Sequence, residues 1–389
     1  MLYHDRKGLK GMEFMENRKK LLFHVNSMGK GGAERVISIL SKRFVKDGYG
    51  VVIVTLWRAD EEYELADGVR RINLGDEGKV KNTGCIVPAF RRIVLALERF
   101  TSLRKVIRKE KPDLVISFCN KANFRCSYSM FGMKTPLLVS VRNDPRIDYF
   151  PYKHGVRRME KKAAGCVFQT QDALNCFDEK FREKSRVIWN PLDDKYLTDF
   201  DDIKEKSKYI VNVGRLSVQK NQLLLLSAFR RIMDKIPEYE VRIYGEESEN
   251  GVKKFLDDYI EKNEMQSRVR LMGASSHLEK EICDASLFVL SSDYEGLPNA
   301  LIEAMALGIP VISTDCPCGG PGELIENGVS GGLVPVGDEK KLSEVMLNLL
   351  SDPDYAERIG KNGKKVRERV SPDRIYREWK DFVEELAHV

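Results

Sequence analysis

Histidine is scarce in this sequence of 389 residues: there are five copies, and none forms the H-x-x-x-H spacing of a metal site. The eight cysteines include no C-x-x-C pair, and the closest two are Cys316 and Cys318 in "CPC". Scattered reduced thiols in a cytosolic protein fit this usage better than a disulfide framework or a zinc site. We therefore expect no metal and no other cofactor.

Long hydrophobic runs are missing as well. No stretch of about 18 apolar residues occurs, so the sequence predicts no membrane span. The first twenty residues are charged and lack an apolar core, which argues against a signal peptide and predicts a solvated basic leader. Two nucleotide fingerprints also fail. Lys30 is followed by glycine, so there is no P-loop, and Glu34 replaces the third glycine of G-x-G-x-x-G, which disfavours a dehydrogenase.

Charge is present in both signs but is unevenly distributed. Residues 1–190 carry 38 Lys and Arg against 22 Asp and Glu, a net charge of +16. The remaining residues carry 27 against 37, a net charge of −10, so the whole chain is at +6. This asymmetry suggests two domains with different partners.

Short apolar runs alternate with helical stretches in both halves. In the first half the runs are "LLFHVN", "VVIVTLW", "DLVISF", "PLLVSV", "GCVFQT" and "RVIWN". In the second half they are "YIVNVG", "YEVRIYG", "RVRLMG", "SLFVLSS", "IPVIST" and "GGLVPV". Such runs indicate buried parallel strands with crossover helices. The predicted fold class is therefore α/β, with two doubly wound, Rossmann-like domains.

The domain boundary is expected at "NPLDDKYLTDFDDIKEKSK", a polar segment read as a solvated linker. This places an N-terminal domain at 1–190 and a C-terminal domain at 191–370. Ser371-Pro372 starts a last helix, 371–389, whose apolar stripe includes Trp379. That helix packs either on its own domain or, as we expect, back on the first.

The stretch "SSDYEGLPNALIEAMALGIPVIS" holds two acids in apolar surroundings, Glu295 and Glu303. It is typical of a buried strand, a turn carrying Glu295, and a helix with Pro298 at its first position. Ligands of doubly wound sheets bind beyond the carboxyl ends of the strands, where N–H groups of Asn299 and Ala300 suit phosphate. Carboxylates suit hydroxyls, so Glu303 is placed for a ribose diol and Glu295 for a sugar. Alternatively, Glu303 is a solvated helix residue.

"EGLPNALIE" resembles the E-x7-E motif of the family 4 glycosyltransferases, which have the GT-B fold of two domains facing a cleft. Further stretches resemble the same family in the expected order. They are "MGKGGAERV", "WNPLD", "NVGRLSVQKN" and "TDCPCGGPGELIENGVSGGLVPVGD". Together these matches extend over most of the chain. The resemblance implies a nucleotide-sugar donor, most often UDP-linked, in the C-terminal domain, and an acceptor in the N-terminal domain.

The resemblance also assigns roles to single residues. Arg215 and Lys220 are expected on the donor diphosphate, with Glu295 as the third catalytic residue. Arg and Lys complement phosphate oxygens, so the physical chemistry agrees. Donor contacts are expected from five residues: Gly31, Gly32, Asn299, Ala300 and Glu303. The glycines permit close backbone approach after the first strand.

One stretch departs from the usual family pattern. Many members have a histidine after the strand that corresponds to "PLLVSV", whereas this chain reads "SVRNDP" with Arg142 there. An arginine cannot act as a base at neutral pH. Capsule and surface-polysaccharide enzymes of the family share a similar stretch, which implies acceptor contacts for Arg142, Asn143 and Asp144. We interpret His24 as a core strand residue rather than a substitute.

Basic amphipathic segments occupy the N-terminal half. "FRRIVLALERFTSLRKVIRKEKP" and "KHGVRRMEKKAAG" combine apolar stripes with cations, including Arg91, Arg92, Arg104, Lys105, Arg108 and Lys109. They are either core-facing helices with solvated faces or helices that lie on an anionic bilayer. The charge of +16 favours the second. No nucleic-acid motif is present.

These observations lead to one functional hypothesis. The chain is expected to be a retaining glycosyltransferase of surface-polysaccharide biosynthesis, moving a hexose or N-acetylhexosamine to a glycan or polyprenyl-diphosphate-linked acceptor. It would be cytoplasmic and peripheral on the inner face of the cell membrane. A GT-B sugar-nucleotide epimerase and a non-catalytic sugar-nucleotide-binding subunit are the alternatives.

Overall fold

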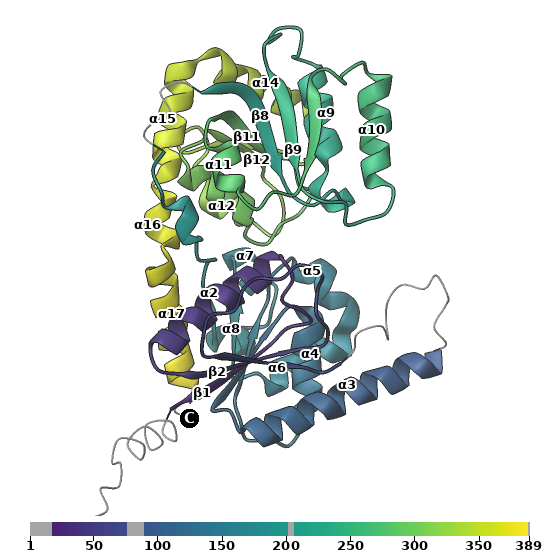
Figure 1. Cartoon of the computed structure of the whole chain (residues 1–389), viewed down its shortest axis with the longest axis vertical. Coiled ribbons are helices and arrows are strands. Elements are labelled where there is room, and N and C mark those ends of the chain that lie inside the picture. Colours follow the sequence, from purple (N-terminus) through teal and green to yellow (C-terminus); the bar gives the residue numbers. More distant parts are fainter. Residues whose placement is uncertain (1–17, 76–88, 201–205, 388–389) are drawn as a thin grey trace, which may run out of the picture. The chain divides into compact units, whose positions relative to one another are not determined.

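The computed structural model describes residues 18–75, 89–200 and 206–387, and for residues 89–93 the backbone alone. Residues 1–17 of the expected basic leader, and the side chains of Arg91 and Arg92, lie outside the described residues; Lys20, the last residue of that expected leader, begins the first strand. The chain forms two units, shown in Figure 1. The first takes in the chain up to Phe168, Leu174–Ile188 and the stretch from Tyr376 on. The second takes in Gln169–Ala173 and Trp189–Ile375.

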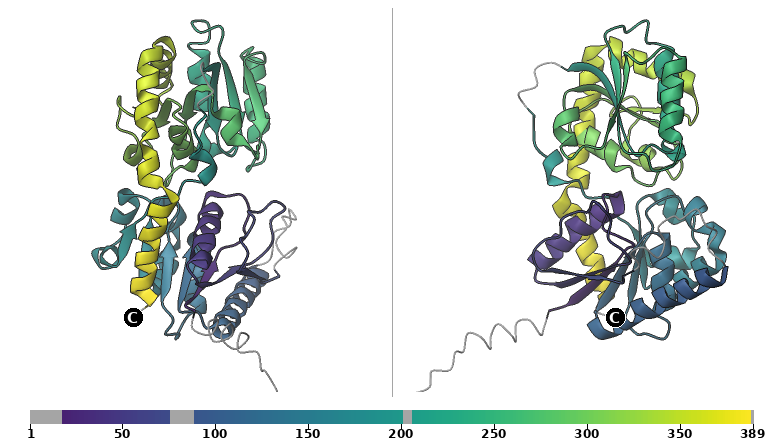
Figure 2. Two further views of the ribbon diagram at one scale, coloured as in Figure 1. Left: turned by 60° about the vertical axis from the view of Figure 1, so that its left-hand side comes forward. Right: turned by 45° about the vertical axis from the view of Figure 1, so that its right-hand side comes forward.

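The first unit is built on a seven-stranded parallel sheet in the order β3-β2-β1-β4-β5-β6-β7. The strands are β1 (Lys20–His24), β2 (Gly50–Thr55), β3 (Val69–Asn73), β4 (Leu114–Phe118), β5 (Leu137–Ser140), β6 (Gly165–Phe168) and β7 (Ser185–Val187). The main connecting helices are α2 (Gly32–Lys46), α3 (Ala89–Glu110), α4 (Asn120–Ser129) and α6 (Lys153–Lys162). Shorter helices are α5 (Pro145–Asp148), α7 (Gln171–Asn175) and α8 (Glu179–Glu183). Helices lie on both faces of the sheet, as the two views of Figure 2 show.

The second unit has a six-stranded parallel sheet in the order β10-β9-β8-β11-β12-β13. Its strands are β8 (Ser207–Val213), β9 (Glu240–Tyr244), β10 (Val269–Gly273), β11 (Ala285–Leu290), β12 (Val311–Thr314) and β13 (Gly332–Val334). Its helices are α9 (Gln222–Arg230), α10 (Val252–Lys262), α11 (Leu278–Ile282), α12 (Asn299–Ala306), α13 (Gly320–Leu324), α14 (Glu339–Ser351), α15 (Pro353–Lys364) and α16 (Val366–Val370). Both sheets confirm the predicted doubly wound α/β class.

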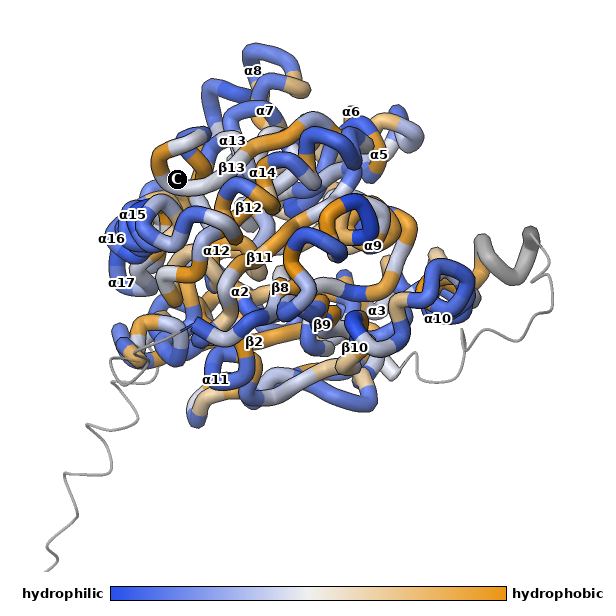
Figure 3. The backbone as a smooth tube through the Cα atoms, turned by 90° about the horizontal axis from the view of Figure 1, so that it is seen from above, coloured by the Kyte–Doolittle hydropathy of each residue, from blue (hydrophilic) through white to orange (hydrophobic). Residues whose placement is uncertain are grey.

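The central strands are apolar because both faces of each sheet are covered. Every residue of β4 is buried, as are Leu287, Phe288 and Val289 of β11. Figure 3 shows the resulting pattern: hydrophobic residues run along β2 and β11, and α10 and α15 consist largely of hydrophilic residues. Continuous apolar runs are what parallel sheets require, since neither face meets water.

The last helix, α17 (Pro372–Ala387), contributes its residues from Tyr376 on to the first unit. Trp379 is fully buried, and its ring stacks on Phe118 of β4 with centroids 5.6 Å apart. At the helix surface, Lys380 Nζ lies 2.7 Å from the Asp47 carboxylate at the end of α2. A stripe of large apolar side chains, rather than the charged face, therefore fixes this helix on the first sheet.

The expectation that the linker is solvated is wrong for its first part. Leu192 and Tyr196 are buried, so its first part packs on the second unit instead of being solvated. Arg367 of α16 donates hydrogen bonds to the Tyr196 and Thr198 carbonyls at 3.1 Å, which accounts for this packing. Residues Gln169–Ala173 also belong with the second unit, although they precede the expected boundary at 190. Within the described residues, no helix is long and apolar enough to cross a membrane.

His24 is buried in β1, which confirms its reading as a core residue. Its Nδ1 lies 2.9 Å from the Val54 carbonyl, which can only accept, and its Nε2 lies 2.8 Å from Arg125 Nη1, which can only donate. His24 is therefore the neutral Nδ1–H form. Burial, reinforced by the Arg125 cation, lowers the pKa of His24 to about 3.

This depressed pKa makes the first unit acid-sensitive. The unfolded histidine takes up a proton near pH 6.5, while the folded one does not until about pH 3. The stabilising contribution of His24 is thus present above pH 6.5 and falls below it by up to about 1.4 kcal/mol per pH unit. Urea titrations between pH 7 and pH 5 should show a shallower loss of unfolding free energy in His24→Gln than in the parent. The exposed His154, changed to Gln, is the control; equal slopes in all three proteins contradict the assignment.

Candidate active site

Two turns meet at the carboxyl edge of the second sheet, one after β8 and one after β11. The Asp293 N–H donates to the Gln219 carbonyl at 2.9 Å, and Gln219 Nε2 donates to the Tyr294 carbonyl at 2.9 Å. These cross-links join the turns because β8 and β11 are neighbours in the sheet. They bring together Lys220 and Glu295, which are 75 residues apart in sequence.

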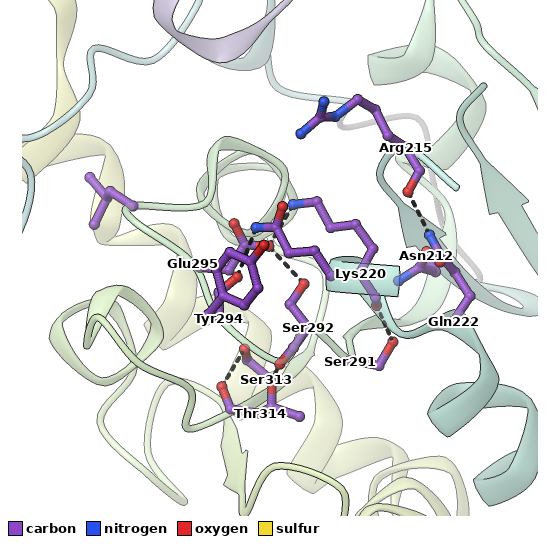
Figure 4. Close-up of polar contacts among 12 residues, drawn as sticks. Asn212, Arg215, Lys220, Gln222, Ser291, Ser292, Tyr294, Glu295, Ser313 and Thr314 are labelled. Atoms are coloured by element: carbon purple, nitrogen blue, oxygen red, sulfur yellow. Dashed lines mark hydrogen bonds and ion pairs between the residues drawn. The ribbon is translucent and has the colours of Figure 1, made fainter. Parts of the chain in front are cut away.

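Lys220 and Glu295 form the central ion pair of these turns (Figure 4). Lys220 Nζ lies 2.5 Å from Glu295 Oε1, and the two side chains are only 16% and 8% exposed. Ser292 Oγ donates to the same carboxylate oxygen at 2.7 Å. An ammonium group has three N–H donors and a carboxylate has two oxygens. Within the described part of the chain, two donors of Lys220 and the Oε2 atom of Glu295 therefore remain for a ligand.

Arg215 lies in the turn after β8 and is held by its backbone. Its carbonyl accepts a hydrogen bond of 2.9 Å from Gln222 Nε2, at the start of α9. The side chain is exposed, and Figure 4 shows it extending from the turn without a polar contact to the other residues drawn. Among the residues that the structure describes, its guanidinium makes no ion pair. The turn thus presents one cation that is paired, Lys220, and one that is available.

The helix after Glu295 differs from the expectation by one residue. α12 begins at Asn299, and Pro298 precedes it with extended backbone instead of occupying the first helical position. Asn299 and Ala300 therefore form the first turn, where backbone N–H groups lack helical partners. Glu303, one turn later, is 3% exposed. The alternative that Glu303 is a solvated helix residue is wrong, because the helix side that carries it is covered.

The loop after β12 packs tightly against the turn that carries Glu295. The Glu295 N–H donates to the Pro317 carbonyl at 2.6 Å, and the Cys318 N–H donates to the Glu295 carbonyl at 2.8 Å. A Cβ atom at Gly320 would overlap the carbonyl group of Gly296. Gly320 of "CPCGG" therefore permits this close approach, which fixes the backbone of Glu295.

Among the site residues that the structure describes, Cys316 in the loop after β12 carries a thiol close to Glu295, and it is not a reactive nucleophile. Cys316 is 2% exposed, and burial, with the nearby Glu295 carboxylate, raises the pKa of its thiol to about 12. It stays protonated at neutral pH. In the described part of the chain, no group of three or more His, Cys, Asp or Glu side chains is arranged to hold a metal ion.

Sequence reasoning missed Asn190 as a site residue. Its Nδ2 donates to Asn299 Oδ1 at 2.6 Å and to the Leu297 carbonyl at 3.1 Å. The only sequence signal was its position before Pro191 at the expected boundary. Because Asn190 precedes Asn299 by 109 residues, no local pattern connects them.

The remaining expected donor residues, Gly31 and Gly32, belong to the first unit. Gly31 directly precedes α2 at the carboxyl end of β1, and Gly32 is the first residue of that helix. A Cβ atom at Gly31 would overlap the Glu34 carboxylate. Gly31 has an ordinary φ of −88°, so its backbone conformation does not require glycine, and the Glu34 carboxylate is the end of a flexible side chain.

The three expected acceptor residues follow β5, also in the first unit. The Arg142 guanidinium lies 5.4 Å from the centre of the Phe118 ring, and burial lowers the pKa of Arg142 to about 10. It is therefore still a cation at neutral pH. Asp144 caps α5: its Oδ1 accepts from the N–H of Arg146 at 2.9 Å and from Nε at 3.0 Å. Asn143, between them, is half-buried.

Two family models match successive parts of the chain. "Glycosyltransferase Family 4" matches residues 30–196, and "Glycosyl transferases group 1" matches residues 197–366. The two matches divide the sequence close to the point where the second unit begins, at Trp189.

Similarity over three quarters or more of the chain is seen with several known proteins. The chain is 24% identical over 375 residues to the GalNAc-alpha-(1->4)-GalNAc-alpha-(1->3)-diNAcBac-PP-undecaprenol alpha-1,4-N-acetyl-D-galactosaminyltransferase of Campylobacter jejuni, covering 95% of this chain and 99% of that protein. It is 26% identical to the capsular polysaccharide biosynthesis glycosyltransferase CapM of Staphylococcus aureus, covering 75% and 82%. Among solved structures, HepE of Anabaena in complex with UDP and glucose superposes with a TM-score of 0.77 at 19% identity, covering 94% and 100%.

Proposed function

We propose, since the chain belongs to the family 4 glycosyltransferases of GT-B fold, that it transfers a hexose or N-acetylhexosamine from a UDP-sugar with retention of configuration. Membership makes it a glycosyltransferase of polysaccharide or glycan biosynthesis; the donor, the acceptor and the stereochemistry are the proposal. The acceptor is a glycan or a polyprenyl-diphosphate-linked glycan. The observation that carries this function is the buried contact between Lys220 and Glu295 beside the exposed Arg215.

The cations serve the leaving group. As the bond between sugar and diphosphate breaks, negative charge grows on the phosphate oxygens. The two remaining donors of Lys220 and the fork of Arg215 stabilise that charge, and such preorganised groups supply a large part of a catalytic effect. Because two cationic side chains serve the leaving group, we propose that no metal ion is required.

The carboxylates serve the neutral parts of the donor. Glu295 Oε2 accepts hydrogen bonds from sugar hydroxyls, next to the ammonium that holds the diphosphate. Glu303, one helical turn into α12, accepts from the ribose diol. Buried carboxylates repel phosphate but bind hydroxyls well, so this division places each charge against a suitable group.

The relatives support the choice of donor and acceptor. The HepE structure contains UDP and glucose, and the name of the Campylobacter jejuni relative includes a PP-undecaprenol-linked glycan. We propose that the first unit receives a comparable acceptor, with Arg142 as a cation for its phosphate or glycan. Asn143 is a second candidate contact, while Asp144 is already used as a helix cap.

A lipid-linked acceptor places the enzyme at a membrane, and we propose peripheral attachment to the inner face of the cell membrane from the cytoplasm. In α3, α4 with the turn after it, and α6, residues 94–110, 120–135 and 153–162 carry thirteen Lys and Arg against three Glu. Three large apolar side chains of these segments are exposed: Leu97 by 56%, Tyr128 by 40% and Phe131 by 66%. Exposed cations beside exposed apolar groups suit an anionic bilayer.

The function is tested by product analysis. The chain is incubated with UDP-hexoses and UDP-N-acetylhexosamines, with and without polyprenyl-diphosphate-linked glycans. Free UDP and the mass and anomeric configuration of the glycan are then measured. Acceptor-dependent UDP release with one sugar added is expected. A changed sugar without an acceptor indicates an epimerase, and donor binding without release indicates a binding subunit.

Replacing either cation should abolish most of the turnover. Arg215→Ala and Lys220→Ala are each expected to lower kcat by at least ~100-fold, the scale of losing one preorganised charge at the reacting centre. The exposed Arg230→Ala, at the end of α9, is the control and should keep parental turnover. Near-parental rates in both site variants would refute the diphosphate assignment.

The two glutamates should affect different parts of the donor. Glu303→Gln is expected to weaken UDP and UDP-sugar alike, by ~10- to 100-fold, the range for a hydrogen bond to a charged group. Glu295→Gln should weaken the UDP-sugar more than UDP. Calorimetric titration of both ligands against both variants decides this, and identical loss patterns in the two variants contradict the assigned roles.

Membrane binding should depend on α3, but not on Arg104. Arg104 Nη1 donates to the carbonyls of Ser129 and Phe131, both at 2.7 Å, so it supports the fold. Reversing the exposed Lys105, Arg108 and Lys109 to Glu should release the protein from anionic vesicles, at ~1 kcal/mol per cation near the surface.

The matched control reverses the same number of charges on the second unit: Lys254, Lys262 and Lys280, all exposed. This control should still co-sediment with anionic vesicles. Binding should also weaken with added salt, because screening shortens the reach of each charge to about 8 Å near physiological ionic strength. If the α3 variant pellets like its control, or the parent never pellets, α3 is a solvated surface helix.

A further inference from the structure

The turn that leads into α12 is held by hydrogen bonds from a buried side-chain amide, that of Asn190. Asn190 is 2% exposed and belongs to the segment that enters the second unit. Its Nδ2 donates to the Leu297 carbonyl at 3.1 Å and to Asn299 Oδ1 at 2.6 Å. Asn190 thus contacts both sides of Pro298, just before the first helical turn.

The hydrogen-bond polarity of these amides is fixed by their neighbours. A backbone carbonyl accepts only, so the Asn190 group facing Leu297 must be the NH2. The other end, Asn190 Oδ1, accepts from Gln169 Nε2 at 2.8 Å, which agrees with that orientation. Both groups of Asn190 are therefore engaged with defined polarity.

This polarity determines the orientation of the next amide. Because Asn190 presents its NH2 to Asn299, Asn299 must turn its carbonyl oxygen toward Asn190. Asn299 Nδ2 then points away from Asn190. The side chain of Asn299 is half-buried, and its bond to Asn190 is its only side-chain hydrogen bond to residues that the structure describes. Two N–H donors of Asn299 are left for a ligand.

We propose that the Asn299 side-chain NH2 donates a hydrogen bond to the diphosphate of the sugar nucleotide, and that Asn190 is the positioning residue that turns this NH2 toward it. The inference rests on the proposed function, which places a diphosphate beside Lys220 and the start of α12. An amide that presented its carbonyl instead would repel the phosphate oxygens. Asn190 therefore selects the attractive one of two orientations that have the same shape.

The first test separates phosphate binding from nucleoside binding. Asn299→Ala should weaken UDP by about 10-fold, one hydrogen bond to a charged group, and leave uridine binding unchanged. Dissociation constants are measured for both ligands by competition against a fluorescent UDP analogue. The matched control is Asn212→Ala, a buried asparagine whose Nδ2 donates to the Val289 carbonyl at 2.8 Å. It should keep the parental ratio of UDP to uridine affinity.

The second test asks whether Asn190 acts through Asn299. In Asn190→Asp, a carboxylate faces the Leu297 carbonyl and accepts from Asn299, whose amide must turn its NH2 inward. UDP affinity should fall at least 10-fold, the cost of exchanging attraction for repulsion at one phosphate contact. The same substitution in the Asn299→Ala background should add less than about 3-fold, because no amide remains to turn.

The outcomes are distinguishable. If Asn190→Asp lowers UDP affinity equally in both backgrounds, its added charge or a general structural effect is responsible, and the proposal is overturned. The same holds if Asn299→Ala binds UDP like the parent, a result that stands even where the Asn190 variant fails to fold. If the parent binds UDP no more tightly than uridine, the proposed donor site is overturned as well. If the parent turns over normally while the tests on Asn299 and Asn190 fail, the glycosyltransferase function still stands and only this inference is lost.

Discussion

The ion pair between Lys220 and Glu295 is the contact on which the carboxyl edge of the second sheet depends. Each charge alone would be costly to bury, whereas the pair, with Ser292, satisfies both. It joins the turns after β8 and β11, which are neighbouring central strands, while Gln222 holds the backbone of Arg215 in the first of these turns. A sugar nucleotide combines an anionic diphosphate with a neutral, hydroxyl-rich sugar. In the proposed function, the cation of this contact faces the diphosphate and its carboxylate faces the sugar.

The first unit depends on a different kind of contact, one between aromatic rings. Phe118, the last residue of β4, stacks on Trp379 of α17 with an interplanar angle of 15° and supports the Arg142 guanidinium. The helix contributed by the far end of the sequence thus lies beneath a cation at the carboxyl edge of the first sheet. The Phe118 ring thus contacts both a core side chain, Trp379, and a cation at the edge of the sheet, Arg142.

Apolar periodicity was sufficient to predict twelve of the thirteen strands described, because buried parallel strands need unbroken apolar runs. The exception, β3, lies at a sheet edge, where Arg71 is paired with Glu62 and the strand reads as polar. The E-x7-E spacing located Glu295 and Glu303, but not the burial of Glu303, which results from tertiary packing. Asn190 escaped detection for the same reason: its partner Asn299 is close only in the folded chain.

The return of α17 to the first unit has a consequence for synthesis on the ribosome. Seven strands of the first sheet have been made by Val187, yet the indole that fills its core, Trp379, is added almost two hundred residues later. The second unit, in contrast, needs nothing beyond Ile375. The half of the protein that is translated first is therefore completed last. While the nascent chain is still growing, the ring of Phe118 can stack on Phe23 but lacks its contact with Trp379, and during this interval a chaperone would find exposed aromatic surface.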